Sequence, residues 1–229
     1  MPELERLDGS AAVDGTPIVG DHSLQKMIHM MLVEKLDQVD EKARVEVDIL
    51  LDRQKRVEFL NKYEREVNSV IDNKTGTVER EKLNDLIEEG LELKADADIR
   101  RENAAKLRDE IEELKADDEE GNKAEIAKKT KEAEWLEQSA EEAYTVLQAC
   151  DIIDKEGNVV DGLTTYIETA TTRLMENIRS YKKMLQTRNN TQSQMVQRLN
   201  NERNEALMLA KDIQKTIHEI MKRMASNIR

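Results

Sequence analysis

Proline and glycine are missing from long stretches of this chain. The last proline is Pro17, and from Leu163 to Arg229 there is no glycine either. Because proline blocks a helical hydrogen bond and glycine weakens a helix, such a stretch can run as nearly continuous α-helix. At ~1.5 Å per residue, the C-terminal stretch alone predicts roughly 100 Å of helix. A helix of that length must lie against other long helices, in the same chain or in another copy.

The composition favours narrow helix–helix contacts over a globular core. Charged residues make up 37% of the chain and aromatic residues only 3%. Aromatic side chains bury about 150–250 Å² each. A chain with so few of them depends on Leu, Ile, Val, Met and Ala, which is typical of coiled coils. The predicted fold class is all-α, an elongated coiled-coil helical bundle.

The net charge and the apolar runs limit the possible partners. A net charge of −13 argues against nucleic-acid binding, which needs clustered Lys and Arg. The apolar run Met30 to Val33 is far shorter than the roughly 20 residues of a membrane-spanning helix. The first residues are polar and lack the apolar core of a cleavable signal peptide. We therefore expect no nucleic-acid partner and no membrane insertion, in a chain that is either cytoplasmic or exported without a cleaved signal peptide.

Breaks in the helical periodicity predict three regions. Residues 1–20 are expected to form a disordered N-terminal tail of the export type, followed by Asp21 or Ser23 as the first helix cap. Residues 21–72 and 163–229 are expected to form a central coiled coil. Residues 73–162 are expected to form an inserted acidic helical hairpin, with a connecting loop or small β-hairpin at 151–162.

The insert itself has a predicted internal order. We expect a helix from about Val78, which Gly90 could kink, and then an antiparallel hairpin of 95–116 and 123–150 that folds back at Gly121. Its second arm has a regular Ala-rich heptad, so the two arms should approach closely. The final long helix is expected to begin near Leu163.

Apolar residues at steps of three, four and seven mark a seam along the two long terminal helices. We predict that the helices pair through this seam, and that copies of the chain assemble around it. Glu46, Arg53 and Glu64 interrupt the seam on the N-terminal helix. Charged seam residues either weaken a seam or pair across it and fix its register. The predicted assembly seam comprises Leu36, Val39, Leu50, Val57, Leu60, Val67, Val196, Leu199, Ala206, Ile213, Ile217, Ile220 and Met224.

The sequence contains no convincing motif for a catalytic, cofactor or metal site, so we predict a non-enzymatic protein without a cofactor. Asp154 to Asn158 is similar to part of a calcium loop, but positions six and twelve hold Val159 and Thr165 where an EF-hand needs Gly and Glu. A plain turn is expected there. The three histidines lack metal-ligand spacing, and Cys150, the only cysteine, is expected to pack as a small apolar residue.

Methionines concentrate on the first and the final helical regions. Methionine is flexible, so it fills irregular cores, and it also adapts to different partner surfaces. Two interpretations stay open. The methionines fill a core, or they form a face that contacts a chaperone before assembly and sister subunits afterwards.

Three features of the chain recur together in one known family. They are the polar start before Leu24, the loop from Asp151 to Gly162 ahead of a final helix pair, and the Asn- and Gln-rich stretch from Asn189 to Met195 that precedes heptads to Ile228. In these features the chain resembles secreted filament and needle-tip proteins of bacterial type III secretion systems, especially the EspA-type filament subunits. The resemblance implies an uncleaved export region, a coiled coil of the N- and C-terminal helices, and a variable insert between them.

The resemblance also implies a function. We expect a non-enzymatic, self-assembling structural protein of a type III secretion apparatus, either a filament or a needle-tip component, at the cell surface or outside the cell. The expected partners are further copies of the chain, a secretion chaperone on the C-terminal helix, and needle or translocator proteins. The alternative is a cytoplasmic coiled-coil scaffold or a helical chaperone, neither of which needs export.

Overall fold

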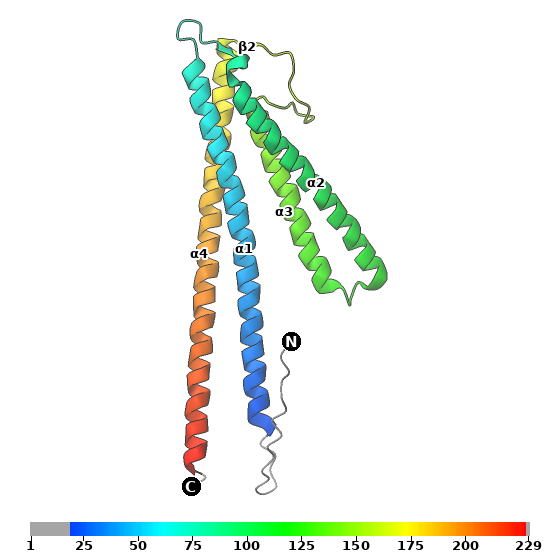
Figure 1. Cartoon of the computed structure of the whole chain (residues 1–229), viewed down its shortest axis with the longest axis vertical. Helices are drawn as coiled ribbons and strands as arrows, with labels where there is room; N and C mark the ends of the chain where they lie inside the picture. The colour runs from blue at the N-terminus through cyan, green and yellow to red at the C-terminus, as the bar shows by residue number, and fades with distance from the viewer. Residues whose placement is uncertain (1–18, 228–229) are drawn as a thin grey trace. The chain divides into compact units, whose positions relative to one another are not determined.

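The computed structural model describes residues 19–227, and nearly all of these residues are helical (Figure 1). The predicted all-α class is confirmed. Among the described residues, none of the helices combines the length and apolar character needed to cross a lipid bilayer. The elements in chain order are α1 (Val19–Val70), β1 (Val78–Glu79), the 3₁₀ helix η1 (Arg80–Leu83), α2 (Asn84–Asp118), α3 (Lys123–Ala149), β2 (Thr165–Tyr166) and α4 (Glu168–Asn227).

The chain divides into two compact units. Unit 1 contains residues 1–43 and 197–229, of which 19–43 of α1 and 197–227 of α4 are described. Unit 2 contains residues 44–196. The predicted division placed its boundaries at the ends of the long helices. The observed boundary falls inside α1 and α4 instead, because α2 and α3 pack onto the parts of these helices that belong to unit 2.

Several predicted helix starts are wrong. α1 begins at Val19, ahead of the predicted cap at Asp21 or Ser23. A single Gly20 costs only about 1 kcal/mol in a helix, so it does not stop a long one. Of the predicted disordered tail, residues 1–18 lie outside the described residues.

The helices that follow the two interior turns also start later than predicted. Val78 and Tyr166 pair across a two-stranded antiparallel ladder of β1 and β2, and both are buried. This ladder delays α2 to Asn84 and α4 to Glu168. The β-branched Val78 and the aromatic Tyr166 are good strand formers, but only their pairing across the fold reveals the ladder.

The hairpin of α2 and α3 follows the predicted Ala-rich pattern. The two helices turn back at 119–122, and Figure 1 shows them side by side. Gly90, Ala97, Ala104 and Ile111, spaced by seven residues, are the buried positions along α2. Ala133 and Ala140 are fully buried on α3. Such small side chains allow close approach of the helices but remove little apolar surface from water.

A compact apolar core lies at the end of unit 2 where the helices and the β1–β2 ladder meet. We call it the head core. Four of the six aromatic residues of the chain are buried there, and the rings of Phe59 and Tyr63 lie 5.9 Å apart. The aliphatic members include Leu60 of α1, Leu147 of α3 and Leu174 of α4, all fully buried. This core ties all four helices of unit 2 together.

The C-terminus of α3 is built into the head core. Asp151 has a left-handed backbone with a φ of 51°. The Ile152 N–H donates to the Leu147 carbonyl at 3.0 Å, and the Asp151 N–H donates to the Gln148 carbonyl at 3.1 Å. This pair of bonds is a Schellman motif, which satisfies the last carbonyls of a helix. Ile152 is thereby directed into the core, where it is fully buried.

Gly90 makes room for this turn. α2 runs through Gly90 without a break, so the predicted kink is not needed to explain the glycine. A Cβ at position 90 would lie 2.5 Å from Ile152 Cδ1 and 3.2 Å from Leu147 Cδ2. The glycine therefore allows α2 to approach the end of α3.

The 151–162 segment is a structured loop with one β-bridge between Ile153 and Val159. A connecting loop or a small β-hairpin was predicted for this segment.

Candidate functional site: a buried ionic cluster and an exposed apolar surface

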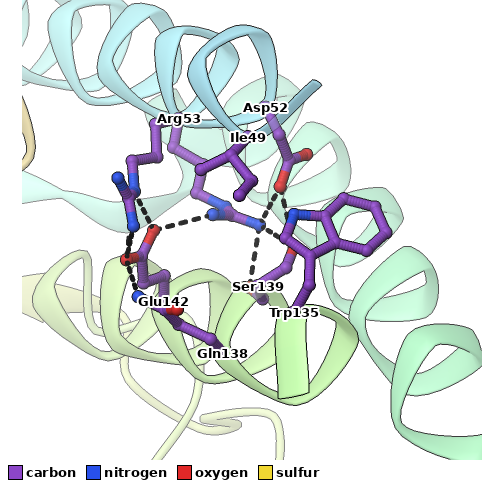
Figure 2. A pocket seen from close by; sticks show the side chains of 8 residues that line it. Ile49, Asp52, Arg53, Trp135, Gln138, Ser139 and Glu142 are labelled. Carbon is purple, nitrogen blue, oxygen red and sulfur yellow. Dashed lines mark hydrogen bonds and ion pairs between the residues drawn. The ribbon is translucent and has the colours of Figure 1, made fainter. Parts of the chain in front are cut away.

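Charged side chains gather in the interior of unit 2 around Glu142 of α3 (Figure 2). Glu142 is only 6% exposed and accepts hydrogen bonds from three arginines. Arg53 donates through Nε to Oε2 at 2.8 Å, and Arg56 donates through Nη1 to the same oxygen at 3.1 Å. Arg188 of α4 donates to Oε1 at 2.7 Å. The ionic cluster therefore joins α3 to both α1 and α4.

Asp52 of α1 is the second carboxylate of the ionic cluster. Its Oδ2 accepts from Arg56 Nη2 at 2.6 Å, from Arg100 Nη1 of α2 at 2.6 Å and from the Ser139 hydroxyl at 2.7 Å. Arg56 thus bridges Asp52 and Glu142, and it also donates to the Ser139 carbonyl at 2.8 Å. Through Arg100, the cluster also includes α2, and all four helices contribute to it.

The pKa values of both carboxylates reflect this environment. Burial alone would raise the pKa of Glu142, but hydrogen bonds and charges from Arg53, Arg188 and Arg56 bring that pKa below its usual value. Burial likewise opposes ionisation of Asp52, and Arg100, Arg56 and Ser139 outweigh it and lower its pKa. Both groups are therefore ionised at neutral pH. Their ion pairs stabilise the fold there, and that stability is lost in acid.

The space inside the ionic cluster is very small. A cavity of about 10 Å³ is lined by Ile49, Trp135 and Gln138 together with members of the cluster. That volume holds about one water molecule. Because the charged groups are directed at one another, as Figure 2 shows, the geometry suits the fastening of helices rather than the binding of a substrate.

A second polar region lies beside the head core. Arg80 is 7% exposed, and its Nη1 and the Tyr166 hydroxyl have no hydrogen-bond partner among the described residues. Burial, the largest cause, raises the pKa of Tyr166 to about 12. An open hollow of about 550 Å³ adjoins η1 and the 159–165 segment, and its lining includes Arg80 together with Glu79, Glu81 and Asp161. These opposite charges do not select one class of ligand.

Cys150, Asp154 and the histidines are the other residues considered for metal binding or reactivity. The described residues contain no group of three or more His, Cys, Asp or Glu side chains able to hold a metal ion. Cys150 is fully buried in the head core, and burial raises the pKa of its thiol well above the usual value. The Asp154 carboxylate accepts from the Asn158 N–H at 2.8 Å, which is the geometry of a plain turn. His218 is exposed, and the side chains of His22 and His29 lie outside the described ones.

The charged residues of the predicted seam all have partners. Glu64 accepts from Arg179 of α4 at 2.8 Å and also pairs with Lys182. Glu46 accepts a hydrogen bond from Gln192 of α4. These contacts cross the seam, so Glu46 and Glu64 follow the prediction that charged seam residues pair across it. Arg53 differs, because its main partner is Glu142 of α3.

The predicted assembly seam has different surroundings in the two units. In unit 2, Val57, Leu60 and Val67 are buried in the head core, so they are not available to another copy. Leu50 and Val196 are half-buried. In unit 1, Val39, Leu199 and Ala206 are buried, Leu36, Ile213 and Ile217 are half-buried, and Ile220 is 47% exposed. The side chain of Met224 lies outside the described ones.

Unit 1 exposes a ring of large apolar side chains that we call the apolar collar. Its members on α1 are Met30, Met31 and Val33, which are 43–64% exposed, and on α4 they are Leu207, Met208 and Leu209, which are 45–68% exposed. The antiparallel helices of unit 1 are joined by an ion pair between Asp40 and Arg203 at 2.7 Å. This register places the two groups of residues about one helical turn apart along the helix pair.

Sequence reasoning missed the ionic cluster except for Arg53. The available signal was the group Asp52, Arg53 and Arg56 on one turn of α1, with Ser139 and Glu142 three residues apart on α3. Residues at these spacings share a helix face, but only the packing of α3 against α1 shows that the two groups meet. The apolar collar was partly visible, since the methionines had suggested a partner-binding face.

Comparison of the chain with protein-family models, with curated proteins and with solved structures gives no match.

Proposed function

We propose that this protein is a non-enzymatic structural protein that self-associates through unit 1. The observation that carries this proposal is the apolar collar, whose six members are all more than two-fifths exposed. Large contiguous apolar patches on a protein surface mark interaction sites. Covering the collar with helices of further copies would remove this surface from water at about 25 cal/mol per Å².

The arrangement of the collar explains why one chain cannot cover it. Met30 to Val33 and Ala206 to Ala210 are runs of consecutive apolar residues, so they surround their helices. A helix that is apolar on all sides is normally buried on all sides. Two helices can bury only the stripe along which they touch, and in unit 1 that stripe contains Val39, Leu199 and Ala206. The outer sides of the collar need other helices.

A structural rather than catalytic role is further supported by the ionic cluster. Its four arginines pair with its two carboxylates around a cavity the size of one water molecule. Such a cluster resists separation of the helices, because removing one partner leaves a buried charge unpaired. We propose that unit 2 is the rigid part of the subunit and that unit 1 is its assembly part.

The resemblance to type III secretion filament and needle-tip proteins makes the proposal more specific. We propose that the protein is an exported component of such an apparatus, at the cell surface or outside the cell. A secretion chaperone would cover the C-terminal helix before assembly, and needle or translocator proteins would be further partners. The exposed Leu207, Met208 and Leu209 of α4 are suitable contacts for such a chaperone.

Light scattering coupled to size-exclusion chromatography tests self-association. The full chain is expected to increase in mass with concentration, and the variant Met208→Gln/Leu209→Gln is expected to remain monomeric over the same range. Leu51→Gln is the matched control, because Leu51 is 51% exposed on α1 but belongs to unit 2. A wild-type chain that stays monomeric at high concentration would contradict the proposal.

Export is tested separately. The tagged chain is produced in bacteria that have a type III secretion system, with and without its secretion ATPase, and the culture supernatant is assayed. We expect the chain in the supernatant only when the ATPase is present. Self-association combined with retention in the cell would instead favour the cytoplasmic scaffold.

A further inference from the structure

The ion pair between Asp40 and Arg203 defines one face of unit 1. Residues at steps of three and four from each partner lie on that same side of the helix pair. On α1 this row continues through Asp37 and Val33 to Met30, and on α4 it continues through Leu207 to Lys211. We call this the first face. Its α1 row is acidic and its α4 row is basic, with apolar collar residues in both rows.

The opposite side of the helix pair has the reverse pattern. On α1, Met31, Lys35 and Lys42 form a basic row at steps of four and seven. On α4, the corresponding row is acidic apart from Arg198 at its end. We call this the second face, and its α4 row consists of Arg198, Glu202, Glu205, Leu209 and Asp212, all exposed.

The inverted charges of the two faces restrict how copies can meet. When the first face of one copy lies on the second face of another and the copies are parallel, α1 lies on α1 and α4 lies on α4. The acidic α1 row then meets a basic α1 row, and the basic α4 row meets an acidic one. Collar residues of both copies are also at the same level. Antiparallel contact of two first faces through their α1 helices would place Asp37 and Asp40 against like charges, which is unfavourable.

We infer that copies of this chain stack side by side through unit 1, in parallel, with the first face of each copy on the second face of the next. This inference rests on the proposed self-association and adds its geometry. The contact is heterologous, so one type of contact repeats from copy to copy and the assembly grows beyond a dimer, into a ring where the rotation between copies closes and into an open filament where it does not. A closed pair made through two first faces would leave Met31 and Leu209 exposed in both copies.

Charge reversal at Lys35 and Asp37 tests this geometry. Both residues are exposed, and neither forms an ion pair within the described residues. In the stack, Lys35 of one copy faces the acidic α1 row that contains Asp37 of its neighbour. Lys35→Glu alone is expected to raise the concentration for half-association roughly two- to fivefold, a range typical of exposed ion pairs. Adding Asp37→Lys in the same chain is expected to restore wild-type association.

Other geometries give different results. If two first faces meet with α1 on α4, Asp37→Lys opposes Lys211 of the neighbour while Lys35 lies outside the contact, so Lys35→Glu alone changes nothing and the double variant is as weak as Asp37→Lys alone. That result, or a mass that stops at a dimer in light scattering, would overturn the stack while leaving self-association intact. A monomeric wild-type chain would overturn both. Lys131→Glu, at an exposed position on α3 in unit 2, is the matched control and is expected to change nothing.

Discussion

α1 and α4 pass through both units, yet the same two helices are in very different environments there. In unit 2 their inward residues, such as Leu60 and Leu174, are fully buried. In unit 1 large apolar residues such as Met30 and Met208 are 64% and 68% exposed. The difference comes from what covers the helices. α2, α3 and the β1–β2 ladder complete the core of unit 2, whereas the described part of unit 1 consists of two helices alone.

This contrast separates two sources of stability. Unit 2 has an internal core and a buried ionic cluster, so its free energy of unfolding should not depend on protein concentration. Unit 1 buries few residues within one chain, and a two-helix pair gains little from burial. Its order should therefore increase with association, because binding to the folded state adds stability by mass action.

The largest effect is expected from Glu142→Ala. The substitution leaves Arg53 and Arg56 buried without their shared carboxylate, and loss of one partner from a buried ion pair costs about 3–5 kcal/mol. Urea unfolding followed by the fluorescence of Trp135, which lies beside Arg100 in unit 2, measures the change. Glu137→Ala is the control, since its pair with Arg108 is exposed and exposed pairs contribute about 0–1 kcal/mol. Equal losses for the two variants would show that the ionic cluster does not fasten unit 2.

A leucine pair compares the units directly. Leu60→Ala in the head core should lower the free energy of unfolding by about 2–5 kcal/mol, as is usual for a fully buried leucine. Leu207→Ala, at a site that is 45% exposed, should change it by less than about 0.5 kcal/mol in dilute solution. Hydrogen exchange provides a second measurement. Leu207→Ala should reduce the protection of the backbone amides of residues 197–227 only at concentrations where the wild-type chain associates. Protection of this segment in a dilute monomer would remove the distinction between the units.

Gly90→Ala tests the close packing of the head core. Alanine gains about 1 kcal/mol of helix propensity over glycine, but its Cβ would overlap Ile152 Cδ1 at 2.5 Å. Overpacking typically costs about 1–3 kcal/mol, so we expect a net loss of roughly 1 kcal/mol in urea unfolding. Glu88→Ala, at an exposed position of the same helix, should be neutral within about 0.5 kcal/mol. Stabilisation by Gly90→Ala would mean that Ile152 moves aside at little cost.

The smallest effect concerns pH. Because the pKa values of Asp52 and Glu142 are lowered in the folded protein, their contribution is complete above the unfolded pKa of about 4. It is lost as the pH falls through the lowered values. The free energy of unfolding of unit 2, measured in urea, should therefore fall between about pH 5 and pH 3 by an amount on the order of 1 kcal/mol. Glu142→Gln should have a shallower dependence on pH, and an unchanged slope would assign the effect to other carboxylates.

Much of the fold could be predicted from local patterns. The Ala-rich heptad of α3 and the turn at Gly121 identify the hairpin, because these signals depend only on residue spacing. The β1–β2 ladder could not be predicted, since two-residue strands have no periodicity and their partner lies far away in sequence. The head core was hidden for a similar reason, because the few aromatic residues are scattered along the chain and meet only after folding.

The sequence by itself determined that the chain is helical, where its long helices run, and which of their faces are apolar. These properties follow from proline and glycine placement and from a 3.6-residue period, which act locally. Only the tertiary structure decided that Glu142 pairs with arginines from two other helices. It also decided that apolar residues of the long helices are enclosed in the head core of unit 2, whereas the apolar collar of unit 1 is exposed. Those outcomes depend on contacts between segments distant in sequence, such as Arg53 with Glu142 and Asp40 with Arg203, whose meeting no local pattern specifies.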